Sequence, residues 1–309
     1  MESLKVYVQK SFLDIFYRLI DNRDFDGNKL NLFSLKMKDK NFNYSLLIDE
    51  LTDTVINFCT SSKEYEVACS TNKYGRLSRE SREKFREYSK MRKEGEKYKN
   101  TTTKDGELGE LILYSLLESH MDAPKILTKM RFKTSTNDPV KRADGIHLLK
   151  SDEGCYKLIY GESKLYEDYD KGVAEAFKSI DDFKNRDNNN IDTEYNFLIS
   201  NLDSEFDECK YQEIKKILIP SEEDIEYDTA FAIFIGFEID IPDTIAKKKP
   251  VQFREEMKQY ITRLIEAKII NIENLIEKYN LQDHDLFIYL LPFTELNKSK
   301  VKILEGILR

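Results

Sequence analysis

The sequence predicts an α/β protein whose central unit runs helix, strand, strand, strand, helix, strand. Residues 107–119 are apolar on nearly all sides after their first turn, which is typical of a helix buried against a sheet. Three strand-like segments follow, separated by turn residues. With 309 residues, 40% of them hydrophobic, the chain can bury one large core, or one core and a smaller appended unit.

The elements of this unit follow from local patterns of apolar residues. The expected strands are residues 128–134, 143–149 and 156–163, with a fourth at 194–200. The connections at 135–141, which contains Asn-Asp-Pro, and at 150–154 are typical of turns. Residues 171–183 have the apolar period of a helix. Because this helix makes a crossover to the fourth strand, we expect that strand to run parallel to the third.

The segments on either side are predicted to be additions to this unit. Residues 1–100 are expected to form a mainly helical accessory region that docks a partner, with apolar residues at helical spacing in 12–20 and 44–60. Residues 76–99 are charged and helix-prone, and the Thr-Thr-Thr-Lys-Asp-Gly run that follows predicts a boundary, with a second domain at 101–309. Further elements are expected as strands at 229–239 and 286–291, one or two helices in 251–280, and a short closing helix.

The charge is acidic overall but unevenly distributed. The formal net charge is −8, yet residues 73–104 hold twelve Lys or Arg against five Glu, and residues 129–142 hold five against one Asp. Such basic segments would contact phosphates, a protein partner, or both. The alternative for the first segment is a solvated helix in which Glu and Arg side chains pair.

The sequence lacks the residues that several classes of function require. Four scattered cysteines and three histidines offer no zinc-ligand spacing, and neither phosphate-binding glycine motif occurs. Isolated histidines supply no convincing base for a nucleophilic triad. The first ten residues lack the apolar stretch of a secretion signal, and no apolar run reaches 18 residues. We therefore expect a soluble, cytoplasmic protein with reduced cysteines and no membrane association.

One group of residues has the pattern of a catalytic site. In the third expected strand, Glu162 and Lys164 share a face, because side chains alternate along a strand. Asp144 begins the second expected strand. If these two strands form a hairpin, Asp144 and Glu162 meet at the same edge of the sheet. An acidic helix start, then Asp, then Glu-x-Lys is the active-site order of the PD-(D/E)xK nucleases.

The chemistry of this group favours a divalent metal. Two carboxylates, Asp144 and Glu162, together with the main-chain carbonyl of Ser163, make an oxygen-rich site suited to Mg²⁺ or Mn²⁺. Such a metal would polarise a phosphodiester and lower the pKa of a bound water. Lys164 would position that water or neutralise the charged phosphate.

The helix start adds two further acids, and the sequence does not separate them. Glu107 or Glu110 would reach the metal or its water, while the other would be favoured at that position by the helix dipole alone. His147 has the strand phase opposite to that of Asp144 and is expected to be structural.

These segments resemble one known family. The matching stretches are GELGELILY at 106–114, KMRFKTS at 129–135, NDPVK at 137–141, ADGIH at 143–147 and GESKLY at 161–166. They resemble HamA, the nuclease subunit of the bacterial Hachiman anti-phage system, over roughly residues 105–183. Residues 1–100 contribute little to the resemblance.

The resemblance implies a PD-(D/E)xK-like fold and a metal-dependent DNase effector of antiviral defence. It also implies a complex with a superfamily 2 helicase, HamB, which restrains the nuclease until infection. The family's catalytic pattern falls on Asp144, Glu162 and Lys164. Two other interpretations stay open: a catalytically inactive adaptor that binds nucleic acid or the helicase, and a nuclease that acts on RNA.

Overall fold

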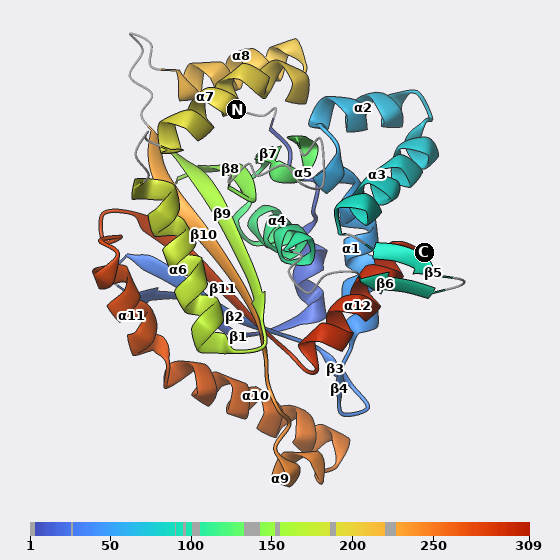
Figure 1. Cartoon of the computed structure of the whole chain (residues 1–309), viewed down its shortest axis with the longest axis vertical. Coiled ribbons are helices and arrows are strands. Elements are labelled where there is room, and N and C mark those ends of the chain that lie inside the picture. The colour runs from blue at the N-terminus through green and yellow to red at the C-terminus, as the bar shows by residue number, and fades with distance from the viewer. Residues whose placement is uncertain are drawn as a thin grey trace.

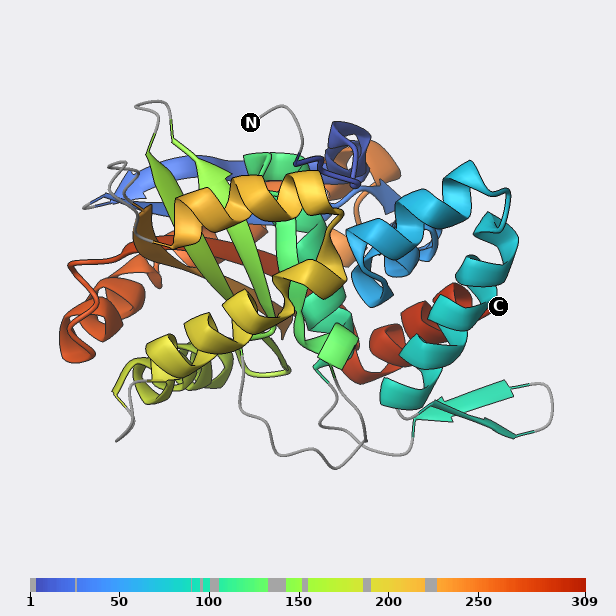
Figure 2. The same cartoon turned by 90° about the horizontal axis from the view of Figure 1, so that it is seen from above.

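A seven-stranded mixed sheet forms the centre of the protein, with helices on both of its faces (Figures 1 and 2). The computed structural model describes residues 4–25, 27–89, 91–94, 97–100, 106–132, 143–151, 155–185, 190–219 and 227–309. The strands are β1 (Phe16–Phe25), β2 (Asn28–Leu35), β3 (Met37–Lys38), β4 (Asn41–Phe42), β5 (Met91–Glu94), β6 (Lys97–Asn100), β7 (Lys125–Thr128), β8 (Gly145–Lys150), β9 (Tyr156–Tyr166), β10 (Tyr227–Glu238) and β11 (Asp285–Phe293). The helices are η1 (Lys10–Ile15), α1 (Tyr44–Cys59), α2 (Ser62–Ser70), α3 (Tyr74–Tyr88), α4 (Glu107–Met121), α5 (Lys129–Phe132), α6 (Tyr169–Asn185), α7 (Asn190–Glu205), α8 (Glu208–Leu218), α9 (Asp243–Ala246), α10 (Pro250–Glu266), α11 (Ile269–Lys278) and α12 (Leu296–Ile307).

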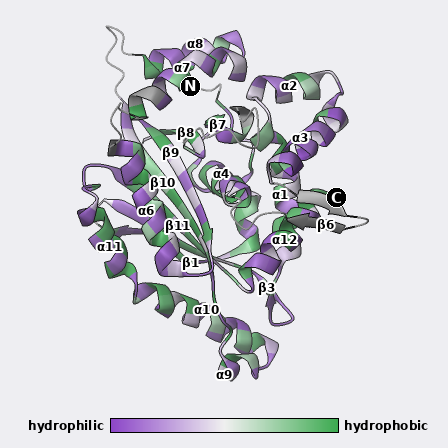
Figure 3. Cartoon of the chain, viewed as in Figure 1, coloured by the Kyte–Doolittle hydropathy of each residue, from purple (hydrophilic) through white to green (hydrophobic). Residues whose placement is uncertain are grey.

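The middle of the sheet is parallel and its edges are antiparallel. The strand order is β1-β2-β11-β10-β9-β8-β7. β10 pairs in parallel with both β9 and β11, whereas β8 is antiparallel to its neighbours β7 and β9. Residues 230–237 of β10 are all buried, because a central parallel strand is covered by helices on both faces. Figure 3 shows this strand as a continuous apolar ribbon.

Two helices sandwich β9, the strand that carries Glu162 and Lys164. On one face, α4 lies so close that a Cβ atom at Gly161 would approach Leu113 to 3.1 Å. On the other face, the ring of Tyr160 packs at a tilt against Phe183 of α6, with 5.1 Å between ring centroids. α4 is buried from Glu107 to Ser119, so its nearly all-round apolar pattern is explained by contacts with β9 and α1 (Figure 1).

Most of the expected elements are confirmed. α1, α4, α6, β8, β9, β10, β11 and the closing helix α12 lie where the apolar patterns predicted them. The region expected to hold one or two helices contains α10 and α11. The order α4-β7-β8-β9-α6-β10 contains the predicted succession of helices and strands, although its last strand comes from a different segment than expected.

The prediction of a helix at residues 12–20 is wrong. This stretch is the short η1 followed by β1, which pairs with β2 from Phe16 to Phe25. Two bulges interrupt the pairing, between Arg18 and Ile20 and between Ile20 and Arg23. Bulges shift which side chains face the core, so the buried residues kept a spacing that also fits a helix. The N-terminal region is therefore not mainly helical.

The predicted strand at residues 194–200 is also wrong, because this segment belongs to α7. Leu198 and Leu202, four residues apart, are fully buried, as on one face of a helix. The strand that runs parallel to β9 is β10, reached after α6, α7 and α8. The expected crossover to a parallel strand is confirmed, but it contains three helices instead of one.

The first expected strand, at residues 128–134, is wrong apart from Thr128. β7 spans Lys125–Thr128, and α5 begins at Lys129. The polar region 76–99 holds most of α3 and then the β5–β6 hairpin rather than one helix. Residues 133–142, which include most of the second basic segment and the turn at 135–141, lie outside the described residues, as do 101–105 and 152–154.

The division of the chain at residue 100 stays a prediction. β2 pairs in parallel with β11, so the first hundred residues contribute two strands to the same sheet as the last hundred. In the part of the chain that the structure describes, no helix has both the length and the apolar character needed to cross a lipid bilayer.

Candidate functional site

The β8–β9 hairpin brings Asp144 to Glu162. In this antiparallel pair Gly145 lies opposite Gly161, and the amide of Asp144 donates to the carbonyl of Gly161 at 2.9 Å. Asp144, one residue before β8, is therefore level with Glu162, one residue further along β9. The hairpin that the sequence analysis required for a shared site is confirmed.

Asp144 is held in a fixed position by Ser163. Its Oδ2 accepts hydrogen bonds from the backbone amide and the hydroxyl of Ser163, both at 2.8 Å. The carboxylate is 8% exposed. These two bonds orient the side chain and leave Oδ1 to meet a positive charge.

Glu162 and Lys164 point to the same region, as their strand phase predicted. Their carboxylate and ammonium groups form an ion pair, and each side chain keeps about a fifth of its surface exposed, 18% for Glu162 and 21% for Lys164. A ligand arriving from solvent can therefore reach this pair, whereas Asp144 lies deeper.

The N-terminal turn of α4 adds acids to the same end of the sheet. Glu107 and Glu110 are both buried in this first turn. A Cβ atom at Gly109 would lie 3.1 Å from Ser163 Oγ, so the missing side chain lets the helix start pack directly against the site. Of the two acids, Glu110 shares an ion-pair partner with Asp144.

That partner is Lys129, which sequence reasoning missed. Its ammonium lies 3.3 Å from Asp144 Oδ1 and 3.8 Å from Glu110 Oε1. Its backbone amide also donates to the carbonyl of Asp144 at 3.2 Å. Lys129 stands at the point where β7 gives way to α5, and the sequence signal for a site residue there was hidden by the expected strand.

The charges of this group depend on one another. Burial raises the pKa of Asp144, but the nearby charges of Lys129 and Lys164 and the bonds from Ser163 outweigh it, so that pKa lies below its usual value. Burial and the neighbouring Asp144 raise the pKa of Glu162, against the effect of Lys164. Burial alone would lower the pKa of Lys129, yet its carboxylate neighbours raise it above the ordinary lysine value.

His147 lies in the interior, as the opposite strand phase indicated. Its Nδ1 donates to the carbonyl of Ala123 at 2.8 Å, and the residue is 1% exposed. Burial lowers its pKa to about 4. A small cavity of about 10 Å³, also bordered by Glu110 and Asp144, lies beside the ring. His147 supports the site from beneath rather than facing solvent.

The donor atoms fit a hard divalent cation in their chemistry. Asp144, Glu162 and Glu110 offer carboxylate oxygens and Ser163 offers its carbonyl, which are the ligands that Mg²⁺ and Mn²⁺ prefer. Within the described residues, no three His, Cys, Asp or Glu side chains are already grouped as a metal site. Here the ammonium of Lys129 contacts the carboxylates instead.

Comparison with known proteins identifies the family. The family model described as HamA matches residues 10–307. The chain belongs to the HamA family. The match covers the whole sheet from β1 to β11 and reaches into the last turn of α12, so it is not confined to the motifs around Asp144 and Glu162. A search of curated proteins found no match.

Membership of the HamA family supports a role in anti-phage defence. In this HamA family member, the region that resembled the family from sequence, roughly residues 105–183, is the one that carries the acidic site.

Proposed function

We propose that this chain is a metal-dependent deoxyribonuclease that acts in anti-phage defence. The observation that carries the proposal is the meeting of Asp144, Glu162 and Lys164 at one end of the β8–β9 hairpin, beside the acidic start of α4. The succession α4-β7-β8-β9-α6-β10, with β9 parallel to β10, supports a PD-(D/E)xK-like core.

The proposed metal is Mg²⁺ or Mn²⁺, held by Asp144, Glu162 and the carbonyl of Ser163. When bound, it would supply Lewis-acid polarisation of the phosphodiester and a water of lowered pKa. Glu110 is the better candidate for the accessory acid, because Lys129 links it to Asp144, and Glu107 is the alternative.

The side chains of the chain itself supply position and charge. Ser163 fixes the orientation of Asp144 through its two hydrogen bonds. The ammonium of Lys164, paired with Glu162 and partly exposed, would stabilise the negative charge that develops on the phosphate oxygens or orient the attacking water. Because the site lies at the end of a rigid hairpin, these groups are preorganised rather than assembled by a loop.

A partner helicase of superfamily 2, HamB, would hold the enzyme in a complex and restrain it. A nuclease that cuts the DNA of its own cell needs such control. The region 1–100 is the proposed docking region, and its helices α1, α2 and α3 lie on the α4 side of the sheet (Figure 1).

An inactive adaptor is the second candidate, and one observation favours it. Each carboxylate of the group already has a lysine beside it, Lys129 for Glu110 and Asp144, and Lys164 for Glu162. Two lysines thus offset part of the charge of three carboxylates, which reduces the need for a metal. The adaptor would then bind nucleic acid or the helicase without cleaving it.

The deciding experiment is cleavage of supercoiled plasmid DNA by the purified chain, alone and with the helicase, in Mg²⁺, Mn²⁺ or EDTA. We expect metal-dependent nicking that falls about 100- to 1000-fold in Glu162→Gln and in Lys164→Ala. An equal loss in Glu110→Gln but not in Glu107→Gln would assign the accessory acid. A parallel reaction on RNA of similar length tests the RNase interpretation.

Matched controls come from the same elements. Lys157→Ala removes a lysine of β9 that pairs with Asp285, and Glu175→Gln changes an exposed acid of α6. Both variants should cleave like the unchanged chain. If no metal supports nicking, with or without the helicase, while DNA binding persists, the adaptor is correct; if the site variants cleave like the controls, another site is responsible.

A further inference from the structure

A second charged feature lies on α3, away from the acidic group formed by Glu110, Asp144 and Glu162. A cavity of about 260 Å³ opens between α3 and the end of α12. Its lining consists of Gly75, Ser78, Arg79, Arg82, Glu83, Arg86, Leu308 and Arg309. The lining thus holds four arginines and one glutamate around a space that is large enough for a phosphate group and its waters. Of these arginines, Arg309 pairs with Glu305 at 3.9 Å.

Three arginines of α3 have no ion-pair partner in the part of the chain that the structure describes. No ion pair joins Arg79, Arg82 or Arg86 to another described residue, whereas Arg76 on the same helix pairs with Glu80 at 2.7 Å. The Nε atom of Arg82 is buried and has no hydrogen-bond partner there. A buried donor without an acceptor is costly, so a ligand with acceptor oxygens would stabilise this arrangement.

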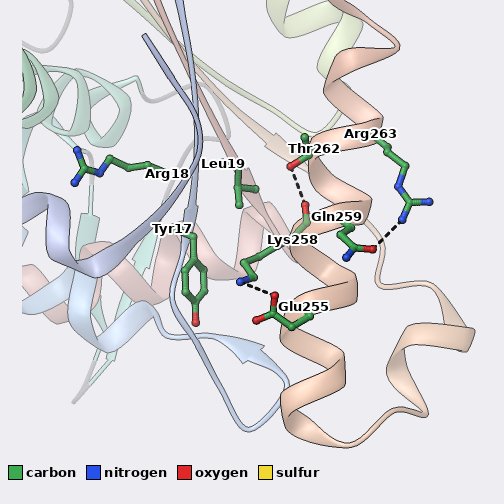
Figure 4. A pocket seen from close by; sticks show the side chains of 8 residues that line it. All are labelled: Tyr17, Arg18, Leu19, Glu255, Lys258, Gln259, Thr262 and Arg263. Atoms are coloured by element: carbon green, nitrogen blue, oxygen red, sulfur yellow. Dashed lines mark hydrogen bonds and ion pairs between the residues drawn. The ribbon is translucent and has the colours of Figure 1, made fainter. Parts of the chain in front are cut away.

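A larger hollow elsewhere provides a contrast. The groove between β1 and α10 has a volume of about 540 Å³ (Figure 4). Its basic side chains already have partners: Lys258 pairs with Glu255 at 2.8 Å and lies over the ring of Tyr17, Arg18 pairs with Asp21 at 3.2 Å, and Arg263 donates to Gln259. The α3 cavity is smaller, yet three of its four arginines have no ion pair within the described residues.

The spacing of the arginines suits a repeating anion. Arg79, Arg82 and Arg86 follow one another at three and four residues, so they line one face of the helix. From Arg79 to Arg86 the helix rises about 10.5 Å, which is long enough to reach more than one phosphate of a DNA strand, whose charges repeat about every 3.4 Å along the duplex axis. Guanidinium groups also match phosphate oxygens in geometry.

The cavity is mechanically connected to the acidic group. Phe85 of α3 packs against Phe58 of α1, and Phe58 packs against Tyr114 of α4, with ring centroids 6.3 and 5.6 Å apart. α4 is the helix that carries Glu110. Figure 1 shows α1 between α4 and α3. A ligand held by α3 is therefore held at a fixed distance from the acidic group.

We propose that the arginine cavity of α3 binds the phosphate backbone of a nucleic acid and holds it while another part of the strand lies at the acidic group. The choice of ligand rests on the proposed nuclease function. Glu83 is the one acidic side chain in the lining and limits how closely a phosphate approaches its side of the cavity.

The test is fluorescence anisotropy of a labelled 20-base-pair DNA duplex in EDTA, where no cleavage occurs. We expect Arg79→Gln/Arg82→Gln/Arg86→Gln to weaken binding about 10- to 100-fold and to reduce the slope of log K against log salt by about 2 to 3. Arg82→Gln alone should reduce that slope by about 1. Arg76→Gln removes the same charge from the same helix outside the cavity and should change affinity less than about twofold.

Thermal unfolding of each variant checks that the fold is retained, and the single variants serve if the triple variant is unstable. The proposal is overturned if the cavity variants bind DNA with the affinity and salt slope of Arg76→Gln. It is also overturned if they lose affinity only for labelled poly-glutamate, which would indicate an acidic protein partner.

Hydrolysis of bis(p-nitrophenyl) phosphate by the unchanged chain is measured in parallel. This small diester has no extended phosphate backbone for α3 to hold, so its hydrolysis reports on the acidic group. Hydrolysis without arginine-dependent DNA binding would refute the cavity and keep the nuclease. Arginine-dependent binding without any hydrolysis or nicking would keep the cavity and refute the nuclease.

Discussion

Helix α4 carries two buried acidic clusters that differ in what holds their charges. Near its end, Glu118 accepts from the backbone amides of Tyr7, Val8 and Lys125, at 2.6, 2.9 and 3.1 Å. Near its start, Glu110 belongs to the acidic group, whose partners are the side chains of Lys129 and Lys164. The charge of Glu118 is thus met by main-chain amides, whereas the charges of the acidic group are offset mainly by lysine side chains, with Asp144 also bonded to Ser163.

The Glu118 cluster is a structural joint. Lys125, beside it, directs its ammonium to the carbonyls of Asn57 and Thr60 at 2.5 and 2.6 Å, at the C-terminal end of α1. A cation there also suits the negative end of the helix dipole. The cluster fastens the N-terminal segment, α1 and β7 to α4, and every bond in it is made to backbone atoms that cannot leave.

The acidic group at the start of α4 has the opposite character. Lys129 and Lys164 are long side chains, and each can rotate away to admit another cation. We therefore expect the exchangeable lysine partners to distinguish the acidic group, in which Asp144 also has a backbone bond, from the structural cluster at Glu118.

The largest loss of stability is expected from breaking the structural cluster at Glu118. Glu118→Ala leaves three buried amides without their acceptor, so we expect the free energy of unfolding to fall by about 3–5 kcal/mol. Urea unfolding followed by circular dichroism measures it. Glu175→Ala, on the exposed face of α6, is the control and should change stability by less than about 0.5 kcal/mol. A loss below about 1 kcal/mol for Glu118→Ala would show that these bonds do not fasten the segment.

The residues of the acidic group differ in how far the sequence could predict them. Strand alternation placed Glu162 and Lys164 on one face, and a hairpin between two expected strands brought Asp144 beside them. These are consequences of local periodicity. No local pattern could identify Lys129, because its role depends on β7 ending at Thr128, which the run of strand-like residues beyond it concealed.

Tertiary contacts explain the remaining errors in the predicted fold. Phe16 and Ile20 are four residues apart and both buried, which fits a helix and equally fits a strand, and pairing with β2 decides in favour of the strand. In residues 194–200, Tyr195, Phe197 and Ile199 alternate like a strand, but the fully buried Leu198 and Leu202 keep the segment helical. In both cases the same few apolar residues fit the period of a helix and also the period of a strand.

A smaller loss of stability is expected at low pH from His147, which is buried beside the Glu118 cluster. Burial lowers the pKa of His147 to about 4, whereas an unfolded chain has a histidine pKa of about 6.5. Between these values the unfolded state binds a proton that the folded state does not. The stability that neutral His147 contributes is therefore complete above about pH 6.5 and is lost as the pH falls toward 4.

At pH 5 this loss is expected to reach about 2 kcal/mol. His147→Asn keeps a donor for the carbonyl of Ala123 but does not titrate, so its unfolding free energy should fall less between pH 7 and 5. Burial also lowers the pKa of His120, so some slope persists in both proteins. Parallel pH profiles for the variant and the unchanged chain would contradict the assignment.

The smallest loss of stability is expected at Lys129. A variant at this residue should also show most clearly how the two clusters differ. Lys129→Met removes the cation shared by Glu110 and Asp144. Because the Lys129 side chain is 24% exposed and water can screen the acids, we expect a loss of only about 1 kcal/mol in EDTA.

Millimolar Mg²⁺ or Mn²⁺ should then raise the unfolding temperature of Lys129→Met more than that of the unchanged chain, because the ion takes the place of the lost ammonium and binds only the folded state. Lys125→Met is the matched control from the other cluster. Its ammonium serves backbone carbonyls, so its stability should not recover with metal. Equal metal-dependent shifts in both variants, or none in either, would mean that exchangeable partners do not distinguish the two clusters.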